Sequence, residues 1–300
     1  MSGFTAIELN KLPAPTVVEQ LNYETILSEL TADLIARDSS LADVLTLETE
    51  PLTILLQVFA YRELILRQRI NEASKSVMLA FATGADLDHL GALFGVSRLL
   101  VSAADTNTIP PIDAVYEADS DYRRRIQLSL EGFSTAGPEG AYIYHALSAD
   151  ADVLDAGATS PTPGDVVVTV LSRTGNGSAN AGLLSTVNTV LSDDDVRPLT
   201  DNVTVQSATI INYSITATLY FYSGPDASLV QDAATAAIET YVSAQRGIGQ
   251  DVTLSGIYAA LHQPGVQRVE LASPSGDISV NSTSAAYCTA ISITNGGYDE

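Results

Sequence analysis

The sequence predicts an α+β protein, with an N-terminal helical region that contains one long helix, followed by α+β layers of split-βαβ, ferredoxin-like type. Three observations predict this class. Apolar residues recur at helical spacing through the first hundred residues. Strand patterns begin only after about residue 152. Beyond that point the elements follow in the order β-α-β-β-α-(α)-β, and the 300 residues suffice for about two domains.

The first hundred residues are expected to be helical. We predict one helix over 19–37 and a long helix over 51–81, which starts at Pro51, a favoured first-turn residue. A helix of about 30 residues is about 45 Å long, which suits a bundle or a subunit contact. Residues 52–61 are apolar nearly all round, so we expect that half to be enclosed. The candidate self-association residues on this helix are Leu52, Leu55, Phe59, Leu66, Ile70 and Val77.

The middle of the chain is predicted to contain a short helix, a linker and two further helices. A short helix is predicted over 86–94, and Gly95 ends it. Residues 101–119 are small, polar and broken by two prolines, which indicates a linker. Helices are then predicted over 121–131 and 138–149, with a break at 135–138.

The second half is expected to alternate strands and helices. The apolar run 165–171 predicts a central strand. Further strands are predicted over 203–207, 212–222 and 266–271, with short ones at 278–281 and 287–293. Helices are predicted over 183–191, 227–245 and 255–262, with a turn at 223–226. The predicted domains are a helical dimerisation or clamp region (1–100), a linker (101–120), a central α+β domain (121–222) and a C-terminal α+β domain (223–300).

Composition restricts the possible partners and compartments. The chain has 36 acidic and 14 basic residues, a net charge of -22, which argues against sequence-independent binding to nucleic acid. No run approaches 18 apolar residues and no signal peptide is apparent, so we expect no membrane span and folding in a reducing cytoplasm. Cys288 is the single cysteine, which excludes an intrachain disulfide.

No catalytic, cofactor or metal site is predicted. His89, His145 and His262 do not have the spacing of zinc ligands, and Cys288 among small residues is better interpreted as a buried thiol. The acids at 193–195 fit a solvated turn better than a cation site, and the glycines at 173–177 lack a phosphate-loop pattern.

The chain has one basic run. It spans 123–125, and on a helix its three side chains would point in different directions. These arginines either pair with nearby acids such as Glu117, Asp119 and Asp121 or anchor an acidic partner surface.

Several motifs in fixed order carry a family resemblance. They are ATGADLDHLG at 82–91, LFGVSR at 93–98, ExDxDYRRRI at 117–126, STAGPEGAY at 134–142, PGDV at 163–166 and VRPLTD at 196–201. Together they resemble the baseplate J family of contractile-tailed bacteriophages and related phage-tail-like particles. The helix at 227–245, GQDV at 249–252 and PGV at 264–266 extend the resemblance.

The resemblance implies a structural, non-enzymatic component of the virion tail baseplate, assembled in the host cytoplasm. Its implied partners are a second copy of the chain, the fibre-side wedge protein and the small lysozyme-like-fold wedge protein, with neighbouring wedges joined into a ring around the hub. Motif residues that either hold the fold or contact partners are Asp86, Arg98, Arg123, Arg125, Arg197 and Asp201. Two alternatives stay open: a non-virion assembly factor, and a tail-associated wall-degrading enzyme, which would need convergent carboxylates that no spacing shows.

Overall fold

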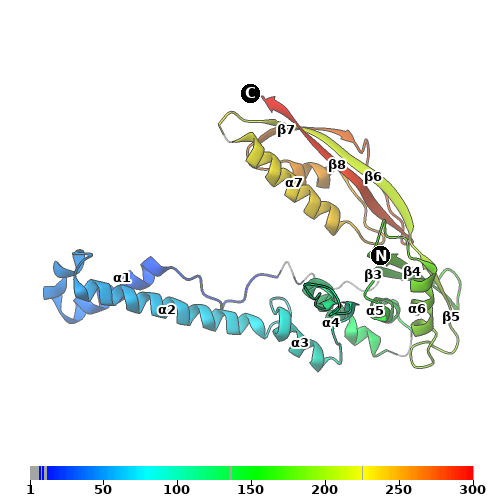
Figure 1. The fold of residues 1–300 in the computed structure, drawn as a ribbon, viewed down its shortest axis with the longest axis horizontal. Coiled ribbons are helices and arrows are strands. Elements are labelled where there is room, and N and C mark those ends of the chain that lie inside the picture. The colour runs from blue at the N-terminus through cyan, green and yellow to red at the C-terminus, as the bar shows by residue number, and fades with distance from the viewer. Residues whose placement is uncertain (1–6, 8, 10–11, 135–136, 225, 300) are drawn as a thin grey trace. The chain divides into compact units, whose positions relative to one another are not determined.

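The computed structural model describes residues 7, 9, 12–134, 137–224 and 226–299 (Figure 1). The contacts divide the chain into two compact units. One consists of Ala6–Ser97 with Asp119–Arg123, and the other of Arg98–Ala118 with Arg124–Glu300, apart from the extreme N-terminus. The predicted breaks at Thr135–Ala136 and at Pro225 lie outside the described residues.

The first unit is helical. It contains α1 (Tyr23–Arg37), the short 3-10 turns η2 (Ser39–Leu41) and η3 (Val44–Thr46), the long α2 (Pro51–Ser76) and α3 (Gly84–Leu93). The side chain of Asn22 caps α1, because its Oδ1 accepts hydrogen bonds from the backbone amides of Glu24 and Thr25. α1 packs along α2, so the two form a helical pair.

The long helix ends at Ser76, five residues before the predicted end. The physical reason is a side chain from far along the sequence. Arg123 donates from Nε to the Leu79 carbonyl and from Nη2 to the Ala82 carbonyl, both at 2.6 Å. The guanidinium thereby holds residues 79–82 in a turn outside the helix.

A close approach explains one glycine of α3. Tyr122 donates its hydroxyl proton to the Val96 carbonyl at 2.8 Å, and its ring passes directly over Gly91. A Cβ atom at position 91 would lie only 2.0 Å from the Tyr122 hydroxyl oxygen, so any side chain there would displace the ring.

The expected linker contains ordered structure. β1 (Leu100–Ser102) and β2 (Val115–Tyr116) form an antiparallel two-stranded ribbon whose residues are all exposed. The helices α4 (Asp119–Gly132) and α5 (Glu139–Ala149) follow, close to their predicted bounds.

The first three-stranded sheet has the order β3-β4-β5. Its strands are β3 (Val153–Thr159), β4 (Asp165–Ser172) and β5 (Asn202–Ser207), and α6 (Ala181–Leu191) crosses between the parallel pair β4 and β5. β4 is central, as predicted, and its Val168 and Val170 are fully buried among side chains of α5 and α6. β3 was not predicted, because its Asp155 and Gly157 are poor strand formers.

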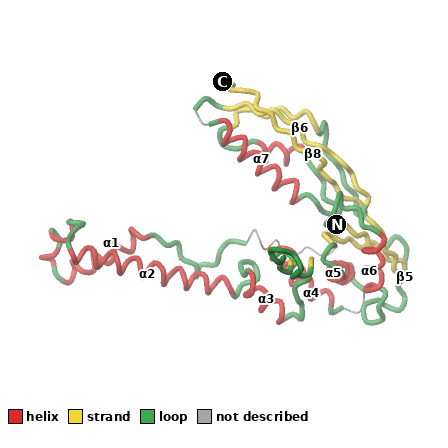
Figure 2. Tube along the Cα trace, in the orientation of Figure 1, coloured by secondary structure: helices red, strands yellow, loops and turns green. Residues whose placement is uncertain are grey.

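The second three-stranded sheet has the order β7-β6-β8. Figure 2 shows its strands in yellow beside the red helix α7. β6 (Thr209–Phe221) pairs antiparallel with β7 (Val266–Ser273) and parallel with β8 (Ser284–Tyr298). The helices α7 (Ala227–Ala244) and α8 (Leu254–Leu261) cover the face that presents Ile215, Leu219 and Phe221. The strand predicted over 287–293 is confirmed within β8, which is longer and spans 15 residues. The strand predicted over 278–281 does not form; Ile278 makes an isolated bridge to Val252.

The mixed α+β class and the helical N-terminal region are confirmed, but the ferredoxin-like arrangement is not. The six strands that follow α5 form two separate sheets with separate cores. β5 and β6 are divided only by Ala208, yet they belong to different sheets. Among the described residues, no helix combines the length and apolarity needed to cross a bilayer.

The core of the second sheet gives a testable consequence. Replacing the fully buried Leu219 with Ala should lower the free energy of unfolding by about 2–5 kcal/mol, because the truncation leaves a cavity among close-packed side chains. Urea denaturation followed by circular dichroism measures this change. Leu229→Ala is the matched control, because Leu229 is 69% exposed and its truncation should have little effect.

Candidate interaction surfaces and motif residues

One long face of α2 is apolar and exposed. Leu55, Phe59, Leu66, Ile70 and Val77 are between 47% and 68% exposed, and Leu52 is half-buried. Five of these six candidate self-association residues recur at helical spacing within α2, and Val77 directly follows its end. The six together are named the α2 stripe. Within the chain, α2 buries only Leu56 and Ala60, and the expected enclosure of residues 52–61 is not complete.

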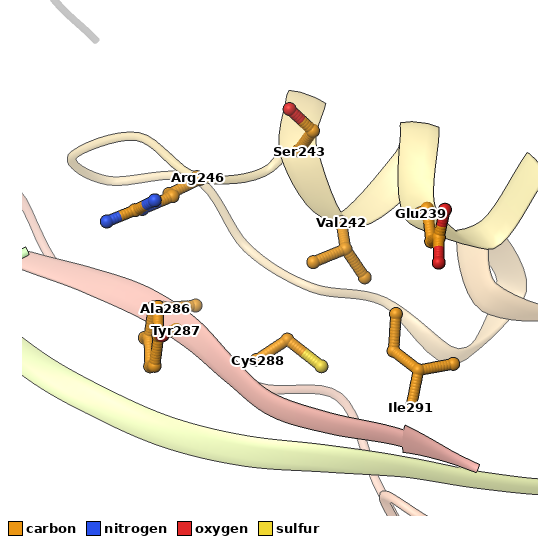
Figure 3. A pocket seen from close by; sticks show the side chains of 8 residues that line it. All are labelled: Glu239, Val242, Ser243, Arg246, Ala286, Tyr287, Cys288 and Ile291. Carbon is orange, nitrogen blue, oxygen red and sulfur yellow. The ribbon is translucent and has the colours of Figure 1, made fainter. Parts of the chain in front are cut away.

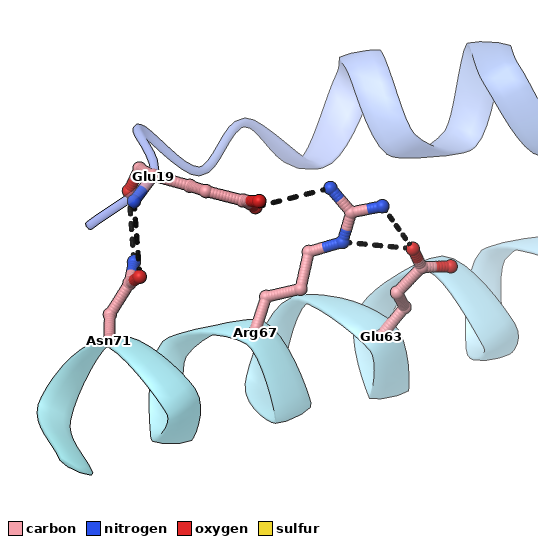
Figure 4. A network of polar contacts seen from close by, with 4 residues as sticks. All are labelled: Glu19, Glu63, Arg67 and Asn71. Atoms are coloured by element: carbon pink, nitrogen blue, oxygen red, sulfur yellow. Dashed lines mark hydrogen bonds and ion pairs between the residues drawn. The ribbon is translucent and has the colours of Figure 1, made fainter. Parts of the chain in front are cut away.

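Polar contacts hold the segment before α1 against α2 (Figure 4). Asn71 and Glu19 exchange two hydrogen bonds of 3.1 and 2.9 Å, between the Asn71 side chain and the Glu19 backbone. Arg67 contacts Glu63 at 2.6 Å and Glu19 at 3.4 Å. Because these ion pairs are partly exposed to solvent, each is worth at most about 1 kcal/mol. They position the helical pair but leave the α2 stripe uncovered.

A buried ion pair joins Glu117 to Arg125. The two residues are only 7% and 5% exposed, and Arg125 binds both carboxylate oxygens of Glu117. Arg125 Nη1 also donates to Ser148 Oγ in α5 at 3.2 Å. At the base of the ribbon, the Leu99 amide donates to Glu117 Oε1, and Arg98 Nη1 donates to the Glu117 carbonyl, both at 2.9 Å. The pair therefore fastens the β1–β2 ribbon to α4 and α5.

The basic run in α4 sends its three side chains to three places. Arg125 pairs with Glu117, as one of the two interpretations expected, and Arg123 instead binds the backbone carbonyls after α2. Arg124 contacts Asp155 of β3 at 2.6 Å. The other oxygen of Asp155 accepts a 2.8 Å hydrogen bond from the Ile248 amide, in the loop after α7. The partner at position 155 had no signal in the sequence, because it lies 31 residues away.

Arg197 and Asp201 hold a loop onto α5. The Tyr142 hydroxyl donates to Asp201 Oδ2 at 2.7 Å, and Arg197 Nη1 donates to the Asp201 carbonyl at 3.2 Å. Burial, together with this hydrogen bond and the Asp201 charge, raises the pKa of Tyr142 well above its ordinary value. The phenol therefore remains a hydrogen-bond donor at neutral pH. Asp86 lies in the first turn of α3, where a carboxylate interacts favourably with the helix dipole.

The histidines and the acidic run do not converge on one site. His145 packs edge-on against Tyr144, with ring centroids 5.2 Å apart, and burial lowers its pKa. His262 ends α8, and Asp193 accepts a hydrogen bond from the Asp195 amide in a local turn. In the part of the chain that the structure describes, no cluster of three or more His, Cys, Asp or Glu residues could hold a metal.

A cavity lies between α7 and β8 (Figure 3). Its volume is about 250 Å³. Cys288 borders it and is half-buried, not fully buried as predicted, because it lies on the edge strand of its sheet. Burial raises the pKa of its thiol. The lining residues are Glu239, Val242, Ser243, Arg246, Ala286, Tyr287, Cys288 and Ile291.

These features, an exposed apolar helix face together with internal ion pairs that hold loops, are typical of a structural protein. Three family models match the sequence: the Baseplate J-like N-terminal domain over residues 48–105, the Baseplate J-like central domain over 134–207 and the Baseplate J-like protein C-terminal domain over 213–294. Baseplate protein J of Escherichia phage P2 is 53% identical over 299 residues, which cover 98% of this chain and 99% of that protein. The chain belongs to the baseplate J-like family.

One solved structure is a more distant match. It is a cryo-EM structure of the anti-feeding prophage baseplate, sixfold symmetrised, with a TM-score of 0.42 and 16% identity. The match covers 61% of this chain and 43% of that chain, and so weak a likeness adds nothing to the argument. Family membership makes the chain a structural baseplate protein and not an enzyme.

The buried ion pair Glu117–Arg125 should contribute far more to the free energy of unfolding than the partly exposed pair Glu63–Arg67. Glu117→Ala leaves Arg125 charged and buried without its carboxylate, so it should lower the free energy of unfolding by about 3–5 kcal/mol. Glu63→Ala removes an exposed partner of Arg67 and should cost about 1 kcal/mol or less. Chemical denaturation of both variants checks this, and equal losses would contradict the assigned role of Glu117.

Proposed function

We propose that the chain is a wedge component of a contractile-tail baseplate, which pairs with a second copy and links neighbouring wedges into a ring around the hub. The observation that carries the proposal is the 53% identity to phage P2 Baseplate protein J over nearly the full length of both proteins. The proposed location is the virion tail baseplate, after assembly in the host cytoplasm. Other proposed partners are the fibre-side wedge protein and the small lysozyme-like-fold wedge protein.

The α2 stripe is the proposed pairing surface. A helix that exposes a row of large apolar side chains gains free energy when a second apolar surface covers it. We assign the clamp to residues 1–100, the linker to 101–120, and the central and C-terminal α+β domains to 121–222 and 223–300. The three matched family models support a division into three parts, but the C-terminal model begins at residue 213. Because β6 pairs with β7 and β8, the last boundary is better placed near Ala208 than at 222.

Charge supports selective assembly. Residues 126–300 contain 18 acidic and 4 basic residues, a net charge of -14, so positively charged partner surfaces are favoured there. The same charge disfavours nucleic acid as a partner. On contraction, we expect the contacts between wedges to rotate as rigid bodies and the domains to keep their folds.

The proposed function is tested by quantitative mass spectrometry of purified particles from the producing strain. About six or twelve copies per particle, as closed sixfold assembly requires, is the expected result. Absence from the particle, with the chain abundant in the lysate, would contradict the wedge role and leave a non-virion assembly factor.

Pairing through the α2 stripe is tested by charge. The double substitution Leu66→Asp with Ile70→Asp should reduce the purified chain to a monomer, because two carboxylates would be buried at an apolar contact. Light scattering measures the mass. Gln68→Asp is the control, because it adds a negative charge to an exposed position of α2 away from the stripe. An unchanged oligomer in the double variant would exclude the α2 stripe as the contact.

A further inference from the structure

The outer edge of β8 lacks the usual protection of edge strands. β8 spans 15 residues and lies at the edge of a three-stranded sheet, where β6 is its neighbouring strand. Edge strands present unpaired backbone groups, and natural proteins protect them with charged residues, proline or short length. Residues 284–298 contain no charged residue and no proline, whereas β7 at the opposite edge carries Arg268 and Glu270. Two irregularities interrupt the pairing of β8 with β6, one at Thr289 and one between Asn295 and Tyr298, and such bulges are a protective feature of edge strands.

Among the described residues, neighbouring segments contact this edge at its start, Ser284–Ala285, and again at Ile293. The Gly249 amide donates to the Ser284 carbonyl at 3.0 Å, next to the bridge between Ile248 and Ala285. Further along, Gln231 of α7 donates from Nε2 to the Ile293 carbonyl at 3.2 Å. Within the stretch 286–292, Cys288 Sγ donates to the Ala290 carbonyl at 3.4 Å, and no other segment of the described residues hydrogen-bonds to this part of the edge in the same way. α7 therefore lies along an edge whose middle stays open.

The cavity lies beside this open stretch. The side chains of Val242 on α7 and of Cys288 and Ile291 on β8 point into it (Figure 3). Its volume of about 250 Å³ exceeds the roughly 30 Å³ of one water molecule but is below the about 300–1,000 Å³ of small-molecule pockets. An apolar side chain of another polypeptide fits such a cavity better than a cofactor does.

Two charged residues border the cavity: the Arg246 guanidinium is hydrogen-bonded within the chain, whereas Glu239 is exposed to solvent. The Arg246 guanidinium donates to the carbonyls of Arg173 and Gly175, at 3.2 and 3.0 Å, and lies 5.3 Å from the centre of the Tyr287 ring. Glu239 is exposed and has no ion-pair partner among the residues that the structure describes. The half of the chain around the cavity is strongly acidic, so a partner that complements its charge would carry basic residues.

We propose that β8 accepts an extended segment of another baseplate protein as an additional strand, with an apolar side chain in the cavity and basic residues beside Glu239. Backbone hydrogen bonds along residues 286–292 supply affinity, and the cavity and Glu239 supply specificity. This inference rests on the proposed function, because the baseplate supplies the partner.

Hydrogen exchange tests the added strand. The full-length chain, free and in purified particles, is exchanged into heavy water, and peptides covering 286–293 are analysed by mass spectrometry. We expect exchange in this stretch to be at least tenfold slower in the particle, since edge amides become paired. Equal exchange in both states, with the chain present in the particle, would overturn the inference alone. A particle without the chain would overturn the proposed function as well.

Photo-crosslinking tests the identity of the segment. A benzophenone amino acid replaces Ser243, which lines the cavity, and in the control it replaces Thr240, which is exposed on α7 outside the lining. In irradiated particles, position 243 should crosslink to another baseplate protein, within a segment that contains Lys or Arg. A crosslink to β8 of a second copy, or equal yields at both positions, would overturn the proposal.

The charge at the rim is tested by reversal. Glu239→Lys should weaken the protection of residues 286–293 in particles at least tenfold, whereas Asp232→Lys, with the same charge change outside the cavity lining, should not. Circular dichroism of both variants verifies the fold. Equal protection in the two variants would refute the role of Glu239.

Discussion

The buried ion pair between Glu117 and Arg125 is the constraint on which the middle of the structure depends. A carboxylate and a guanidinium removed from water are tolerable only when their hydrogen-bonding capacity is used. Here the Leu99 amide, the Ser148 hydroxyl and the bidentate contact use it. The position of Glu117 therefore fixes where the β1–β2 ribbon begins and how α4 lies against α5.

The three consecutive arginines of α4 each hold a different segment of the chain. Residues on a helix are about 100° apart, so three adjacent arginines can reach three different segments. Arg123 holds the turn after α2, Arg124 contacts Asp155 on β3, and Arg125 joins Glu117. The basic run, whose three side chains the sequence already predicted to point in different directions, thus contacts three segments of its own chain. Their partners, two backbone carbonyls and two distant carboxylates, were not all recognisable from spacing.

Local patterns predicted the elements better than they predicted the tertiary contacts. The helices, and β4 as a central strand, were predicted because helical spacing and apolar runs are properties of a short window. The predicted end of α2 was wrong by five residues, because the guanidinium of Arg123, far along the sequence, determines where the helix ends. The division into two sheets depends on which strands pair across long stretches of chain, and Ala208 gives no local signal that β5 and β6 part. β3 was missed because its pairing with β4 overrides its weak strand propensity.

The candidate sites show the same division between local and long-range information. The α2 stripe could be identified from the sequence, because helical spacing alone places five of its six residues on one face. The open edge of β8 could not, because it exists only through the pairing of β8 with β6 and the position of α7. Arg123, Arg125 and Arg197 face inward onto carbonyls and carboxylates of their own chain. We infer that these three motif residues hold the fold, while the α2 stripe exposes apolar side chains and the edge of β8 exposes backbone groups that could pair with another strand. Partner choice is therefore best sought at these two surfaces, where association gains the most free energy.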